Sequence, residues 1–168
     1  MFDSLALLVF PLLMIFAALA DLFTMTIPNR ISLVLIAVYF ALALYLRLPL
    51  ATVGLHVSCG VAMLVVTFTM FQLGLIGGGD AKLAAATALW LGWQLLFDYG
   101  LIASLAGGVL TVSLVILRRY DLPEKLLSVG FIAKLAQKNG GVPYGIALAL
   151  AGLAIYPHTT VWTGLSHL

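Results

Sequence analysis

The most conspicuous shortage in this chain is charge. Only 8% of its 168 residues are charged, whereas 64% are hydrophobic. An ordinary soluble domain is about one-quarter charged. So few charges cannot cover a surface that faces water, and the mean hydropathy of +1.19 is correspondingly high. These values exclude a soluble globular domain and predict an all-α polytopic membrane protein. We expect no nucleic-acid partner.

Cysteine is also scarce. Cys59 is the only one and lies inside an apolar run, so the chain can form neither an internal disulfide nor a cysteine-based zinc site. We interpret Cys59 as a small packing residue. His56, His158 and His167 do not have the spacing of metal ligands. We therefore expect no metal and no other cofactor.

Long apolar runs, separated by charges or turn residues, make up the rest of the chain. None alternates as a barrel strand would, so each is interpreted as a transmembrane helix of one membrane domain, 1–168. The first run lacks a preceding basic region and is interpreted as a retained span, not a signal peptide. The six predicted spans are 4–23, 31–46, 52–74, 81–97, 100–117 and 142–157.

The basic residues predict the orientation of these spans. Seven of the eight fall in connections on one side of the membrane, and only Arg47 falls on the other. Basic residues favour the cytoplasmic side, so both termini are expected outside. The seven cytoplasmic residues are Arg30, Lys82, Arg118, Arg119, Lys125, Lys134 and Lys138.

The only long connection is the loop 118–141. Asp121 and Glu124 have the spacing of a capping box and predict the start of a helix. Apolar residues then recur every four positions, which predicts a short amphipathic helix on the cytoplasmic surface. They are Leu127, Phe131 and Leu135. Five basic and two acidic residues give the loop a charge of +3, so anionic lipid is its expected partner.

Two aspartates border apolar runs on this same side. Asp21 ends the first span, and Asp80 opens the fourth span after three glycines, 77–79. Two crossings separate them, which returns the chain to one face of the membrane. The irregular segment 142–145 opens the sixth span on that face, and irregular backbone at membrane depth is tolerated where it lines a cavity.

A carboxylate at a membrane border is costly unless it is used or paired. Asp80 could simply cap a helix, and Asp21 could be a solvated helix end or a partner of a nearby basic residue. As a pair, however, one carboxylate could take a proton from water while the other polarises a peptide carbonyl. A small proton-coupled carrier and a non-catalytic assembly subunit also remain open, although carrier sites usually lie nearer the bilayer middle.

Three segments resemble the type IV prepilin peptidase family of GxGD aspartyl proteases. The segment Gly77-Gly78-Gly79-Asp80-Ala81-Lys82-Leu83 resembles its glycine–aspartate motif. Asp21 followed by Ile27-Pro28-Asn29 resembles its first aspartate segment. Pro143-Tyr144-Gly145 resembles its last motif, which often has Phe where this chain has Tyr144. The resemblance covers essentially the whole chain, in order.

The resemblance implies a bacterial inner-membrane endopeptidase that removes a short basic leader from prepilins or pseudopilins at the cytoplasmic face. It makes Asp21 and Asp80 the catalytic pair, and the glycines would let backbone approach the substrate. Lys82 could either extend to the membrane border or tune the pair.

One feature departs from the larger members of the family. Those members carry a cytoplasmic domain with paired CxxC motifs and also methylate the new N-terminus, whereas this chain has one cysteine. We therefore expect no methyltransferase activity. The short form resembles the peptidases of Flp/Tad-type pilus systems.

Overall fold

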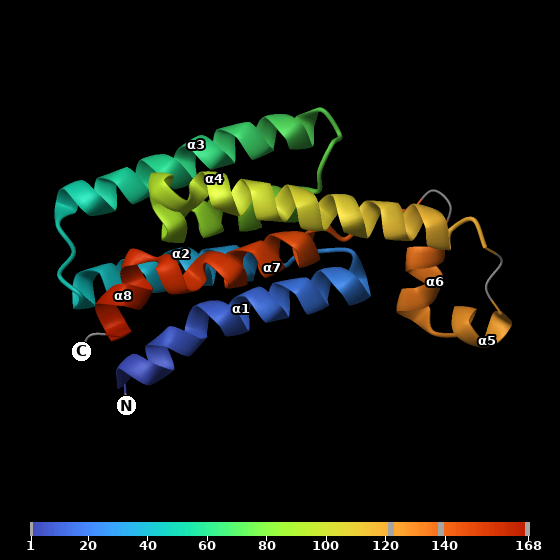
Figure 1. The fold of residues 1–168 in the computed structure, drawn as a ribbon, viewed down its shortest axis with the longest axis horizontal. Coiled ribbons are helices and arrows are strands. Elements are labelled where there is room, and N and C mark those ends of the chain that lie inside the picture. The colour runs from blue at the N-terminus through green and yellow to red at the C-terminus, as the bar shows by residue number, and fades with distance from the viewer. Residues whose placement is uncertain (1, 121–122, 138–139, 167–168) are drawn as a thin grey trace.

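The computed structural model of this protein describes residues 2–120, 123–137 and 140–166, and every regular element among them is helical. The long helices lie side by side in a bundle, with two short helices at one end (Figure 1). In chain order the helices are α1 (Phe2–Thr24), α2 (Asn29–Tyr45), α3 (Leu50–Gln72), α4 (Gly78–Leu117), α5 (Glu124–Leu127), α6 (Gly130–Ala136), α7 (Tyr144–Ile155), the 3₁₀ turn η1 (Tyr156–His158) and α8 (Thr160–Ser166).

Within the described residues, three helices are long and apolar enough to cross a membrane: α1, α3 and α4. A fourth span results if α7 with η1 is joined to α8, from which it is bent by 48°. Helix α2 is apolar but has only 17 residues. The chain is thus a multi-pass helical membrane protein, and the count of six spans stays a prediction.

Helix α4 is 40 residues long but breaks at Gly92, where φ is +67° and ψ is 179°. If it were straight it would be about 60 Å long, with Asp80 and Gly107 about 40 Å apart. Instead both residues line one cavity, so the chain doubles back at Gly92 (Figure 1). The predicted division between 97 and 100 was therefore wrong, because the turn depends on a backbone conformation that only glycine adopts readily.

The first half of α4, residues 78–91, is the central helix of the bundle. From Asp80 to Leu91 every side chain except Lys82 is buried. Five alanines in this stretch let the neighbouring helices approach closely. Near its far end, the Trp90 indole N–H donates to the carbonyl of Leu35 in α2 at 3.0 Å. The central helix thus fixes Asp80 against the surrounding helices.

The 118–141 loop forms two short helices, α5 and α6, because the chain between them is extended at Val129. Asp121 of the predicted capping box, Lys138 and His167 lie outside the described residues. The Arg118 guanidinium donates to the carbonyls of Leu135 (2.8 Å) and Gly141 (2.7 Å), which ties this segment to the end of α4. Its contact with anionic lipid stays a prediction.

The start of α1 and helix α8 lie at one end of the bundle, and α5 and α6 lie at the other (Figure 1). Helix α6 packs on the end of α1, where the rings of Phe131 and Phe23 are 5.3 Å apart. The end of α1 and the starts of α4 and α7 therefore share the end of the bundle that carries the 118–141 segment (Figure 1).

Candidate functional site

Asp21 occupies a core position of α1. The buried residues of this helix recur every three or four positions along one face, and Asp21 continues that row with only 5% of its surface exposed. The row consists of Ala6, Phe10, Met14, Ala17 and Asp21. The carboxyl group therefore points into the bundle, where an apolar side chain would ordinarily continue the core.

The carboxyl group of Asp21 accepts a hydrogen bond from the start of α7. The backbone N–H of Gly145 donates to its Oδ2 at 2.8 Å. Pro143, which is fully buried, precedes α7, and Gly145 is the second residue of the helix. Backbone N–H groups in the first turn of a helix lack intrahelical acceptors, so they are ready donors to a carboxylate.

Asp80 is held in a similar way by its own segment. It is the third residue of α4, which begins at Gly78, and the N–H of Gly77 donates to its Oδ2 at 3.2 Å. Only 8% of Asp80 is exposed, and its Oδ1 is buried without a hydrogen-bond partner. Asp80 thus contributes to the cap of α4 while one carboxyl oxygen is left unused.

Ile27 joins the segments that carry the two aspartates. A Cβ added to Gly79 would lie 3.0 Å from the Cβ of Ile27, and one added to Gly145 would lie 2.7 Å from its Cδ1. Neither glycine could carry a side chain without displacing Ile27. This packing brings together the start of α4, which carries Asp80, and the start of α7, which lies against Asp21.

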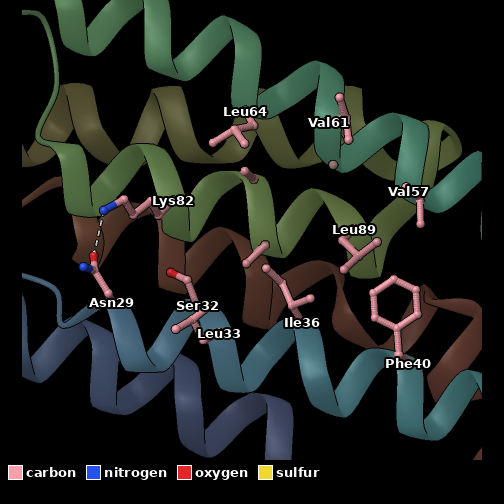
Figure 2. A pocket seen from close by; sticks show the side chains of 13 residues that line it. Asn29, Ser32, Leu33, Ile36, Phe40, Val57, Val61, Leu64, Lys82 and Leu89 are labelled. Atoms are coloured by element: carbon pink, nitrogen blue, oxygen red, sulfur yellow. Dashed lines mark hydrogen bonds between the residues drawn. The ribbon is translucent and has the colours of Figure 1, made fainter.

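Lys82 and Asn29 form a link beside this pair. The Nζ of Lys82 donates to Oδ1 of Asn29 at 2.8 Å, and both side chains lie at one end of a groove between α2, α3 and α4 (Figure 2). Pro28 precedes α2 in an extended conformation, which places Asn29 at the first position of the helix. Lys82 therefore connects the starts of α2 and α4.

Asp80 opens onto a cavity of about 650 Å³ between α3, the two halves of α4 and α7. Among the described residues that line this cavity, Asp80 is the only charged one. Thr111 and Tyr144 also line it, and the Thr111 hydroxyl donates to the Tyr144 hydroxyl at 3.3 Å. The cavity is otherwise mostly apolar.

The predicted site residues thus gather at one end of the bundle, at the segment ends that carry the three motifs. Gly78 packs there against Phe71, because a Cβ added to Gly78 would lie only 3.3 Å from the Phe71 ring. Sequence reasoning missed the role of Ile27, which it quoted only as part of a motif. No pattern in the sequence could show that this apolar side chain packs against Gly79 and Gly145.

Comparison with known proteins gives two kinds of match. A model of the type IV leader peptidase family matches residues 8–112, which include both aspartates. A prepilin leader peptidase/N-methyltransferase of Aeromonas salmonicida strain A449 is 30% identical over 139 residues, which cover 79% of this chain and 42% of that protein. Another, from Aeromonas hydrophila, is 34% identical over 77 residues, covering 46% of this chain and 21% of that protein.

The chain therefore spans less than half the length of these curated relatives. No solved structure matches it. Since the family model covers more than half of the residues, the chain belongs to the type IV leader peptidase family.

Proposed function

We propose that this protein is an aspartic endopeptidase that removes the basic leader peptide of a prepilin or pseudopilin, with Asp21 and Asp80 as its catalytic pair. The observation that carries the proposal is the convergence of two buried carboxyl groups from separate helices. Each accepts a backbone N–H from a glycine, Gly145 or Gly77, and Ile27 packs against both Gly145 and Gly79, the residue before Asp80. Membership of the type IV leader peptidase family supports the same reaction.

The proposed mechanism uses one proton shared by the pair, since two carboxylates held close together cannot both ionise at low cost. The ionised carboxylate takes a proton from water as the water oxygen attacks the scissile carbonyl carbon. The protonated carboxyl group gives its proton to the carbonyl oxygen, which yields a tetrahedral diol. When the C–N bond breaks, a proton passes to the leaving amine and a carboxylic acid remains.

The glycine contacts support this mechanism by fixing the direction of each carboxyl group. Gly145 and Gly77 occupy one oxygen of Asp21 and Asp80 respectively. The Oδ1 atom of Asp80 is buried without a partner, so it keeps the capacity to accept a hydrogen bond from water or substrate that enters the site. A reaction between enzyme, water and substrate requires that the reacting groups are kept in a fixed orientation in this way.

In the proposed arrangement the pair faces the cytoplasm from the bacterial inner membrane in a six-span bundle. The seven basic residues on that side support this orientation. We also propose that this chain does not methylate the new N-terminus, since it carries a single cysteine and no paired CxxC motifs. A methylation assay with S-adenosylmethionine would test that part separately.

The decisive experiment is incubation of the purified protein in lipid with a prepilin, followed by detection of the shortened product. Asp21→Asn and Asp80→Asn are each expected to lower the rate by at least about 10³-fold, because either change removes a proton-transfer group and breaks the pair. Asp98→Asn is the matched control, since Asp98 is exposed. Cleavage at the wild-type rate by either Asp21→Asn or Asp80→Asn would refute the proposal. If the protein were instead a carrier or an assembly subunit, the wild-type protein would cleave no prepilin.

A further inference from the structure

We propose that the cavity beside Asp80 is the docking groove for the apolar helix of the substrate, which packs there against a strip of small residues on the second half of α4. This inference rests on the proposed peptidase function and adds the place where the substrate binds. The strip consists of Gly100, Ser104 and Gly108, which recur every four residues and all line the cavity. They therefore lie along one face of the helix.

The first argument is the state of Asp80. This carboxyl group is 92% buried, lines the cavity, and has an Oδ1 atom without a hydrogen-bond partner. A buried acceptor without a partner costs free energy, typically about 1–3 kcal/mol, unless a bound molecule supplies a donor. The cavity is where such a molecule reaches Asp80.

The second argument is the open space along the strip. A Cβ added to Gly100 or Gly108 would meet no heavy atom within 4 Å, and Ser104 is exposed. Small residues spaced four apart allow a second helix to approach the backbone closely. Gly107, in contrast, already packs against Tyr144, since a Cβ added to Gly107 would lie 3.4 Å from the Tyr144 ring. The strip therefore belongs to the open side of this half-helix, whereas the Gly107 side is already covered by α7.

The walls of the cavity identify the occupant. Thr111 and Tyr144 add hydroxyl groups to the part of the cavity that contains Asp80, whereas Met63, Val66 and Ala103 are among its apolar walls. An occupant that binds both kinds of wall has a polar peptide bond at one end and an apolar segment beyond it. A basic leader followed by an apolar membrane helix has this order, with the scissile peptide bond at the junction.

A second groove provides the natural comparison. It measures about 420 Å³ and lies between α2, α3 and the first half of α4 (Figure 2). It holds Lys82 and the unpartnered hydroxyl of Ser32, but neither aspartate lines it. A substrate helix in that groove would not lie against Asp80, so we favour the cavity with the small-residue strip.

Disulfide cross-linking tests the docking site without requiring catalysis. In an Asp80→Asn, Cys59→Ala background, single cysteines are placed at Ser104 or Gly108, and the prepilin carries one cysteine in its apolar helix. Cross-linking is expected at both positions. Val61→Cys, in the second groove, and Gly54→Cys, exposed on α3 with no heavy atom within 4 Å of an added Cβ, are the controls. Cross-linking at Val61 in preference to Gly108, or none at Gly108, would overturn the inference.

Kinetics provide an independent readout in the otherwise wild-type protein. Gly108→Leu is expected to lower kcat/KM for intact prepilin at least tenfold, mainly through a higher KM, because its side chain occupies the groove. Gly54→Leu is the matched control and should leave both constants unchanged. Thermal unfolding checks that each variant is folded, and Gly108→Ala, a smaller change at the same place, should have a smaller effect.

Unchanged kcat/KM in Gly108→Leu would exclude docking along the strip. This outcome is distinct from failure of the proposed function, which would appear as full cleavage by Asp21→Asn or Asp80→Asn. Prepilin that cross-links at Gly108 but is cleaved by both asparagine variants would retain the groove and reject the aspartate mechanism.

Discussion

At the scale of single residues, the site depends on what two glycines lack. Gly145 and Gly79 both pack directly against Ile27, and Gly145 also lies against Asp21. Their missing side chains allow the backbone of α7 and of α4 to approach the end of α1. The same glycine that leaves room for Asp21 also donates its N–H to that carboxyl group. Space and hydrogen bonding are therefore set by one position.

Gly145→Ala tests this closeness. The new Cβ would lie 2.8 Å from Oδ2 of Asp21 and 2.7 Å from Cδ1 of Ile27, so the carboxyl group must move. Because a shift of about 1 Å in a reacting group can cost about 10²-fold in rate, kcat for prepilin cleavage should fall by about that factor. Stability should fall by about 1–3 kcal/mol, the usual cost of overpacking.

The control for this change is Gly54→Ala on α3, where an added Cβ meets nothing within 4 Å. It should leave both the cleavage rate and the unfolding midpoint close to wild type. A Gly145→Ala protein that cleaves prepilin at the normal rate would contradict the close packing of Asp21 against α7.

At the scale of elements, the break in α4 has the largest consequence. The reversal at Gly92 lets the second half of the helix return along the first, so that Asp80 and the Gly100–Gly108 strip face one cavity. In an unbroken helix the Leu89 carbonyl would accept the N–H of residue 93. Here the Leu89 carbonyl forms a 2.9 Å hydrogen bond with Nδ1 of the buried His56. His56, to which the sequence assigned no function, thus supports the turn.

Gly92→Ala is expected to destabilise the protein by at least about 1–3 kcal/mol, the cost of a side chain in this region of backbone angles. The added Cβ would also lie 3.0 Å from Nε2 of His56. Gly100→Ala is the comparison within the same helix, because its added Cβ meets nothing within 4 Å. Unfolding by denaturant in detergent micelles measures both, and equal stability of the two variants would argue against the strained turn.

The long helices and the contacts between them show how far the sequence could predict the structure. The apolar runs identified the long helices, and the topology of the runs brought Asp21, Asp80 and Pro143-Tyr144-Gly145 to one end of the bundle (Figure 1). Hydropathy could not locate the turn at Gly92, because the residues on both sides are apolar and exposed Asp98 suggested a boundary instead. Likewise, the bond from Gly145 to Asp21 joins residues 124 positions apart and depends on helix packing.

At the scale of the whole molecule, helix lengths bear on how the bundle crosses a bilayer. The hydrocarbon core is about 30 Å thick. The 17 residues of α2 extend only about 25 Å, and residues 78–91 of α4 only about 21 Å. If residues 78–91 entered and left on one side together with 93–117, the bundle would have two fewer crossings, while the 118–141 segment would stay on the side of Asp80. The short, buried first half of α4 therefore makes the crossing number a question for experiment.

Labelling with a membrane-impermeant maleimide tests the proposed orientation, because Ser4 and Ser128 are separated by an odd number of crossings in both arrangements. In a Cys59→Ala background, Ser4→Cys and Ser128→Cys each place one thiol at an exposed position, in the first turn of α1 and between α5 and α6 respectively. Six spans put five crossings between the two positions, so they lie on opposite sides. We expect Ser4→Cys to react in intact cells and Ser128→Cys only after the inner membrane is permeabilised. If both thiols reacted in intact cells, the number of crossings between them would be even, and the proposed cytoplasmic position of the aspartate pair would have to be abandoned.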